Sequence, residues 1–281
     1  MEPTPLTLFL SPHFDDIPLS CGGIAARLAR MGAHCIGITV FAAPHAEDVP
    51  LSPFMQDMHD QWERAAGMNV QSINAVRRRE EEAAMRLLGL HPEWLDLRDA
   101  PYRRGKNESY FYTSDKGLFG TPTREERTRL VADIADKVKA VARHAQERLG
   151  TPGRVRLFAP LGVGRHVDHQ IVFLAARRLG PRFGVLFYED YPYAARPNAL
   201  DDRLRELGLP ARPRVTPISD LIGVKIASIA RYKSQLEMLF GNPDAMPQAV
   251  RSYTGGVAAE AGWPGEYAER VWQLPPVYSL R

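Results

Sequence analysis

The sequence predicts an α/β protein with a mostly parallel sheet, helices on both faces of that sheet and a small C-terminal helical extension. Two observations lead to this fold class. Short apolar segments of strand length alternate with longer segments of helical periodicity, which is typical of a parallel sheet covered on both faces. The 281 residues, of which 44% are hydrophobic, suffice for one large α/β domain or two small ones.

The elements follow from this alternation. An apolar run suits a buried strand, a glycine such as Gly32 or Gly89 ends a helix, and Thr123 with acidic residues behind it begins one. In chain order we expect strand 6–10, helix 19–31, strand 34–43, helices 54–66 and 75–88, strand 93–97, helix 124–149, strand 155–161, helix 167–179, strands 185–188 and 214–218, and one long helix at 221–240.

The segments between these elements differ in character. Residues 99–122 are rich in Gly, Tyr and polar side chains, and an irregular loop of that length is usually a lid or binding loop. We expect substrate specificity to reside there, in residues 44–74 and in the tail. No linker or repeat divides the chain, so residues 1–281 are expected to form one domain, with 241–281 as a helical tail on the core.

Composition excludes several classes of protein. A net charge of +3, from 36 basic and 33 acidic residues, is too balanced to indicate nucleic-acid binding. Two cysteines, Cys21 and Cys35, provide no disulfide framework, which favours a reducing compartment. No signal peptide or membrane-length apolar run is seen, so a cytoplasmic protein is the simplest expectation, as a monomer or an oligomer.

Polar side chains follow the first strand directly. After Ser11-Pro12 come His13, Asp15 and Asp16, at the carboxyl end of a strand and before a helix. Ligands of open α/β sheets bind at that edge. The turn has no lysine that would suit a phosphate, and its imidazole and carboxylates indicate part of a metal site.

The strand at 155–161 repeats this arrangement. A glycine-bearing turn leads into His166, Asp168 and His169 at the head of a helix. His166 and His169 are three residues apart, so a helical start puts them on one face. If the two strands are neighbours, three histidines and three carboxylates converge.

Such a set suits a catalytic zinc ion, which takes about three imidazole or carboxylate ligands and keeps a position for water. The ion lowers the pKa of that water, a free carboxylate can act as general base, and a free imidazolium can stabilise an oxyanion or protonate a leaving amine. Taken alone, the first motif could be a capping cluster and the second a pair of surface histidines. Their joint occurrence at two strand ends favours the metal site.

These residues carry a resemblance to a known family. Pro12-His13-Phe14-Asp15-Asp16, with Gly22-Gly23 behind it, resembles the PHPDD signature of the PIG-L/LmbE-like deacetylases, although Phe14 replaces a proline and Ile17 stands where many members have glutamate. His166-Val167-Asp168-His169 resembles their HxDH signature. Weaker similarities cover much of the chain, at Arg77, Glu80, Asp99, Lys225, Ser234, Gln235 and Tyr232, the last standing where many members have histidine.

The resemblance implies a Rossmann-like fold and hydrolysis of an N-acyl group, usually acetyl on an amino sugar such as N-acetylglucosamine or on a glycoconjugate. It implies that His13, Asp16 and His169 bind one Zn²⁺ per chain, or another divalent metal. It also implies that Asp15 is the general base and that His166 stabilises the oxyanion.

Other residues are weaker candidates. Arg77 and Asp99 are candidate substrate contacts, against the alternatives of a helix-surface charge and a turn cap. Glu189-Asp190 could support the histidines from behind or form a structural turn, and Tyr110-Phe111-Tyr112 could stack on a sugar or anchor their loop to the core.

Other interpretations stay open. Within the same chemistry, the acyl group or amine could belong to a thiol cofactor, an antibiotic or a catabolised sugar. Alternatively, the chain could be a catalytically silent Rossmann-like protein that binds a sugar or nucleotide, although the first turn lacks GxGxxG.

Overall fold

A computed structural model describes residues 6–44, 50–66, 70–179 and 182–276. Within these ranges the strands are β1 (Thr7–Ser11), β2 (Cys35–Thr39), β3 (His91–Trp94), β4 (Val155–Pro160), β5 (Phe183–Tyr188), β6 (Arg212–Pro217) and β7 (Ala268–Gln273). They form a seven-stranded sheet in the order β3-β2-β1-β4-β5-β7-β6. Only β7 runs antiparallel to its neighbours, so the predicted mostly parallel α/β fold is confirmed.

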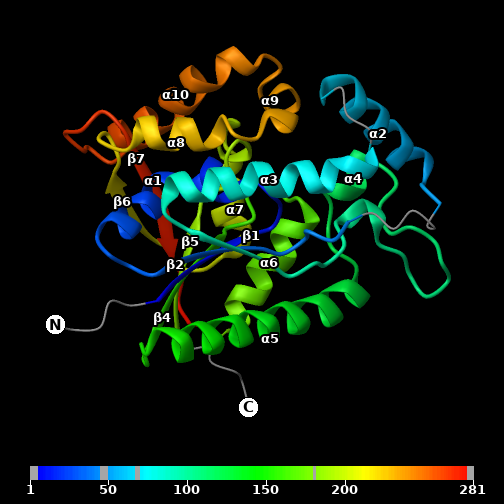
Figure 1. The fold of residues 1–281 in the computed structure, drawn as a ribbon, viewed down its shortest axis with the longest axis horizontal. Helices are drawn as coiled ribbons and strands as arrows, with labels where there is room; N and C mark the ends of the chain where they lie inside the picture. Colours follow the sequence, from blue (N-terminus) through cyan, green and yellow to red (C-terminus); the bar gives the residue numbers. More distant parts are fainter. Residues whose placement is uncertain (1–5, 45–49, 67–69, 180–181, 277–281) are drawn as a thin grey trace.

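The described helices are α1 (Asp16–Arg30), α2 (Pro53–Ala66), α3 (Val70–Leu88), α4 (Asp115–Leu118), α5 (Arg124–Leu149), α6 (Val167–Arg178), α7 (Ala199–Leu207), α8 (Ile222–Ile229), α9 (Lys233–Phe240) and α10 (Met246–Glu260), with 3₁₀ turns η1 (Ala100–Tyr102), η2 (Tyr193–Ala195) and η3 (Pro243–Ala245). Helices α5 and α6 cover one face of the sheet, and α1, α3, α8 and α10 cover the other (Figure 1).

The strands bury apolar side chains on both faces. In β1, Leu8 and Leu10 pack toward α5 and α6, whereas Phe9 points to the opposite layer, as the two-residue period of a strand requires. Phe9 stacks on Phe158 of β4, with ring centroids 4.7 Å apart. Strands β1 and β4 are therefore paired neighbours, which meets the condition for the two motifs to converge.

The expectation of one long helix over 221–240 is wrong. The chain forms α8 and α9, which are separated at Tyr232. Glu80 of α3 accepts hydrogen bonds from the backbone N–H of Ser234, at 3.0 Å, and from its hydroxyl, at 2.6 Å. A carboxylate from another helix thus satisfies the free N–H groups that a helix start creates, while the Tyr232 ring is buried near Phe14.

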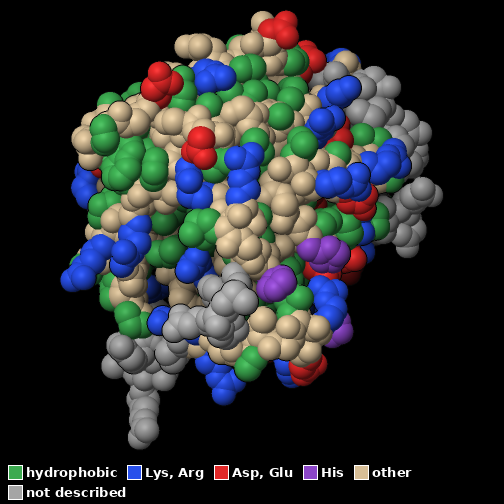
Figure 2. Space-filling view, turned by 60° about the vertical axis from the view of Figure 1, so that its left-hand side comes forward, with side chains coloured by type: hydrophobic (Ala, Val, Ile, Leu, Met, Phe, Trp, Pro, Cys, Tyr) green, Lys and Arg blue, Asp and Glu red, His purple; other side chains and the backbone are tan. Residues whose placement is uncertain are grey.

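The tail also differs from a purely helical extension. It contains α10, but it returns to the sheet as β7, which lies between β5 and β6. Helix α7 was not among the expected elements. On the face drawn in Figure 2, basic and acidic side chains are interspersed, consistent with a net charge of +3.

A buried ion pair satisfies the backbone groups on either side of a break in α1. Cys21 has non-helical backbone angles, φ −141° and ψ 25°, so the hydrogen-bond ladder of the helix is interrupted. Glu269 of β7 accepts hydrogen bonds from the N–H groups of Gly23, at 3.0 Å, and Ile24, at 2.7 Å. Lys225 of α8 donates to the carbonyls before the break, those of Pro18 and Leu19, and pairs with Glu269 at 2.7 Å.

Gly23 has a steric role at the same place. A Cβ atom on Gly23 would lie 2.6 Å from the Ile218 side chain, so only glycine allows this close approach. The break separates the first turn of α1, which carries Asp16, from the rest of the helix. The Lys225–Glu269 pair therefore fixes the orientation of that turn.

We predict that Lys225→Met lowers the free energy of unfolding by about 3–5 kcal/mol, because it leaves Glu269 as an uncompensated buried carboxylate. Urea unfolding followed by circular dichroism measures this loss. The matched control is Lys139→Met, which removes the cation of an exposed pair with Asp136 and should leave stability unchanged. Equal stability of the two variants would contradict the role assigned to the buried pair.

Candidate metal and catalytic site

The site lies where β1 and β4 end side by side, at the point where the strand order reverses direction. The turn after β1 is short and hydrogen-bonded to itself. The Ser11 hydroxyl donates to the His13 carbonyl at 2.6 Å, and the His13 N–H donates to Asp16 Oδ2 at 2.8 Å. The carboxylate of Asp16 is thereby held beside the His13 side chain.

The turn after β4 is shaped by glycines and by one carboxylate. Gly162 and Gly164 have φ of +82° and +83°, angles that favour glycine. Asp190, directly after β5, accepts hydrogen bonds from the N–H groups of Gly162 and Val163, each at 2.8 Å. The same carboxylate lies 2.6 Å from His169 Nδ1. Asp190 thus fixes both the loop and the ring of His169.

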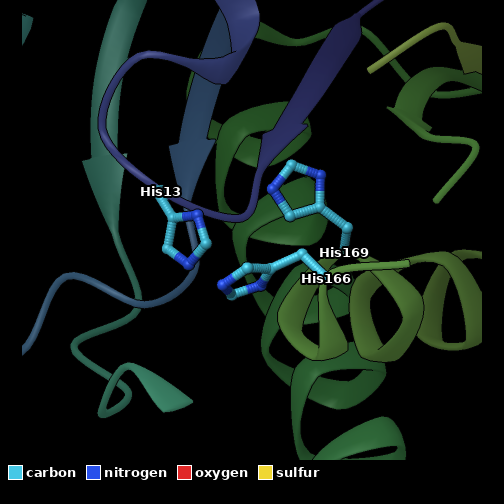
Figure 3. Close-up of side chains that lie close together, drawn as sticks. All are labelled: His13, His166 and His169. Atoms are coloured by element: carbon cyan, nitrogen blue, oxygen red, sulfur yellow. The ribbon is translucent and has the colours of Figure 1, made fainter. Parts of the chain in front are cut away.

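Three imidazoles from these two turns meet (Figure 3). The ring centroid of His13 lies 4.9 Å from that of His166 and 5.4 Å from that of His169, and one nitrogen of each ring lies within 4.8 Å of the others. Asp16 bridges two of them, with Oδ2 3.7 Å from His13 Nδ1 and Oδ1 3.5 Å from His169 Nε2. The structure therefore brings together all three predicted metal ligands.

The donor set fits a divalent metal ion. His169 Nε2 is buried and has no hydrogen-bond partner among the described residues, although leaving such an atom unpaired is costly. Two imidazoles and one carboxylate are ligands that zinc accepts. The other ring nitrogen of each histidine is held by a carboxylate, His13 Nε2 by Asp168 at 3.1 Å and His169 Nδ1 by Asp190. Such outer carboxylates orient metal-binding histidines.

The electrostatics of the cluster also favour a cation. Burial lowers the pKa of His13, but Asp99, Asp168 and Asp16 outweigh it and raise the pKa well above its usual value. In His169, burial again lowers the pKa, and Asp16 and Asp190 raise it above the usual value. A proton and a metal ion compete for the same nitrogens. The negative charge of these carboxylates therefore favours binding of either a proton or a metal ion at the ring nitrogens.

His166 differs from the other two histidines. Its Nδ1 accepts a hydrogen bond from the Asp168 N–H at 3.3 Å, so His166 caps the start of α6. Burial and the neighbouring His13 hold its pKa well below the usual value. The neutral ring must carry its proton on Nε2, since Nδ1 is the acceptor. His166 can therefore donate one hydrogen bond into the site.

Asp15 stands immediately before α1 and is 7% exposed. Burial and the adjacent Asp16 raise its pKa to about 7, although Arg77, His13 and His169 oppose the shift. A carboxylate with a pKa near neutrality can both accept and return a proton at the working pH. The environments of the two neighbouring aspartates thus suit different tasks.

A second buried network supports the cluster, and the sequence interpretation missed it. Arg103 lies in the long loop, is 3% exposed and donates to Asp168 Oδ1 at 2.5 Å and to Glu126 Oε1 at 2.6 Å. Burial opposes ionisation of Asp168, but Arg103 and His13 hold its pKa well below the usual range. No motif or periodicity marks Arg103, which is 65 positions from its partner Asp168.

The two candidate substrate contacts occupy different positions. Asp99 accepts a hydrogen bond from the Ala100 N–H at 2.6 Å, and its Oδ1 also lies 3.4 Å from His13 Nε2. It therefore caps η1 and faces the site. Arg77 lies over the Phe14 ring at 5.1 Å, and its buried Nε has no hydrogen-bond partner among the described residues.

The aromatic segment of the long loop anchors that loop. Tyr112 is buried and hydrogen-bonds Glu126, and Tyr110 hydrogen-bonds the Pro50 carbonyl. Asp190 supports His169 as anticipated, whereas Glu189 instead accepts hydrogen bonds from Tyr253, Arg270 and Trp272. Two aromatic residues near the histidines, Phe119 and Tyr193, carried no recognisable sequence signal. Of the helices described here, none has the length and apolarity to cross a membrane.

Comparison with known proteins agrees with this geometry. The model of the PIG-L family, GlcNAc-PI de-N-acetylase, matches residues 8–179. Two curated relatives are 2'-N-acetylparomamine deacetylases. The Streptomyces fradiae protein is 35% identical, covering 96% of this chain and 90% of the relative, and the Niallia circulans protein is 29% identical, covering 95% and 93%.

A solved structure of a teicoplanin deacetylase in its zinc-inhibited form has the same fold, with a TM-score of 0.78 and 24% identity over 97% of this chain and 99% of the other. The family model spans more than half of the chain and includes both signatures. The chain therefore belongs to the PIG-L family of N-deacetylases.

Proposed function

We propose that this protein is a zinc-dependent hydrolase that removes an N-acetyl group from an amino sugar or glycoconjugate. The observation that carries the proposal is the convergence of His13, Asp16 and His169, with the buried, unpartnered Nε2 of His169 facing Asp16. The raised pKa of Asp15 beside this group supports a general base at the same place.

The curated relatives narrow the substrate class. Both are named for 2'-N-acetylparomamine, and both align over nearly the whole chain. We therefore propose an N-acetylated amino sugar of the aminoglycoside type, and 2'-N-acetylparomamine is the first compound to test.

His13, Asp16 and His169 would hold one ion per chain. Bound there, zinc would supply Lewis acidity and lower the pKa of water. Asp15 takes a proton from the attacking water and returns it to the leaving amine, so that amide and water become acetate and amine. His166 Nε2–H donates a hydrogen bond to the carbonyl oxygen as negative charge develops on it. Asp168 and Asp190 keep the imidazole rings in place.

The first prediction concerns metal content. We expect about one zinc ion per wild-type chain and a loss of at least about tenfold in zinc affinity in His169→Ala, because one of about three ligands is removed. Mass spectrometry of the purified protein measures the zinc. His144→Ala, an exposed histidine of α5, should keep its metal. Full zinc content in His169→Ala would exclude His169 as a ligand.

The second prediction separates the two aspartates. Asp15→Asn should retain zinc but lose roughly 10²–10⁴-fold in kcat, because an amide cannot accept the proton. Acetate release and zinc content are measured on the same sample. Asp136→Asn, on the exposed face of α5, is the control. Turnover by Asp15→Asn close to that of the wild type would remove Asp15 as the base.

The third prediction tests the activity itself. We expect acetate release from 2'-N-acetylparomamine, loss of that activity with a chelator and recovery with added zinc. N-acetylglucosamine serves as the simple amino-sugar comparison. Binding of either sugar without acetate release by the zinc-loaded protein would instead favour the catalytically silent alternative.

A further inference from the structure

Four aromatic rings form a closed circuit at the site. Phe119 contacts His166, with ring centroids 5.4 Å apart, and Tyr193 contacts His169 at 5.7 Å. Phe119 and Tyr193 also contact each other at 5.7 Å, and the two histidines lie 5.4 Å apart. The rings meet at steep angles, between 63° and 84°, as edge-to-face contacts do. This aromatic circuit closes one side of the histidine cluster.

The elements that hold the histidines also hold the other two rings. Tyr193 begins η2, and the Ala194 N–H donates to the Asp190 carbonyl at 2.9 Å, so Tyr193 is fixed to the residue that orients His169. Phe119 ends α4, and the next carbonyl, that of Gly120, accepts a hydrogen bond from Gln170 of α6 at 2.8 Å. Hydrogen bonds therefore hold Phe119 and Tyr193 in place relative to the two histidines.

Gly164 makes room for this arrangement. A Cβ atom at position 164 would lie 2.6 Å from both Cβ and Cγ of Tyr193, and the φ of +83° also favours glycine. Tyr193 thus packs directly against the turn that leads to His166.

We propose that Phe119 and Tyr193 form the wall that restricts the acyl group to acetyl. The inference rests on the proposed deacetylase function, in which the carbonyl oxygen faces His166 Nε2. The acetyl methyl carbon is two bonds from that oxygen, so it lies close to the His166 ring, which Phe119 contacts. Because the four rings already touch, a methyl group can lie against them, whereas a longer chain must displace a ring. Rejection of about 10- to 200-fold per added methylene is the scale expected of such a wall.

The test compares kcat/KM for N-acetyl, N-propionyl and N-butyryl derivatives of one amino sugar. The wild type should lose at least about tenfold with each methylene. Phe119→Ala should raise the ratio of butyryl to acetyl efficiency by at least about tenfold, because it opens the circuit beside His166. Phe119→Leu should shift the ratio in the same direction and retains apolar packing if the alanine variant is unstable.

One matched variant isolates the effect. Phe111 lies in the same loop, is half-buried and packs near Phe119, but among the described residues its ring contacts neither histidine. Phe111→Ala should therefore keep the wild-type acyl preference.

An unchanged acyl preference in both Phe119 variants, with zinc content and acetyl turnover retained, would show that these rings do not restrict the acyl group. Failure of the zinc-loaded wild type on every derivative would overturn the proposed function and the wall with it. The wild-type measurements therefore distinguish the two failures.

Discussion

The structure depends on one buried ion pair, that of Lys225 and Glu269. An interrupted helix leaves N–H and C=O groups without partners, and buried groups of this kind are costly. Here a cation satisfies the carbonyls before the break and an anion satisfies the N–H groups after it. Each charge is therefore neutralised by the other and by the backbone. Because of the break, the first turn of α1 is oriented separately from the rest of the helix. Asp15 and Asp16 lie at the start of that turn. The positions of both aspartates thus depend on contacts that α8 and β7 make with an interrupted helix.

The histidines of the site are likewise held by separate hydrogen-bond partners. In each ring of the cluster one nitrogen is held by its own partner, so each ring has one defined orientation. Asp168 and Asp190 serve the outer nitrogens of His13 and His169, and a backbone N–H serves His166. The carboxylates around the cluster would repel one another, but the Arg103 guanidinium offsets part of that charge through its hydrogen bond to Asp168. Through Arg103 the long loop is consequently a structural part of the candidate metal site.

The sequence was most informative where a short motif lies directly at a strand–helix junction. The convergence of His13, Asp16 and His169 could be predicted because the hydrophobic period changes on either side of them and parallel strand ends meet at one edge. Arg103 could not, since its partners lie in other elements and its loop has no period. The break at Tyr232 is invisible locally, because it depends on Glu80 of another helix. Strand β7 was missed because it carries a buried charge, Glu269, whose partner Lys225 lies in α8, 44 positions away.

The position of β7 has a consequence for how the chain acquires its activity during synthesis. Strand β7 lies between β5 and β6, so β6 joins the sheet only through β7. Glu269 meets the Gly23 N–H across 246 positions of sequence. Contacts of such separation form late, because the intervening chain must be ordered first. A nascent chain that has already produced both signatures therefore still lacks the clamp on its first helix. The turn that carries Asp16 is among the earliest segments made and among the last to be set in place.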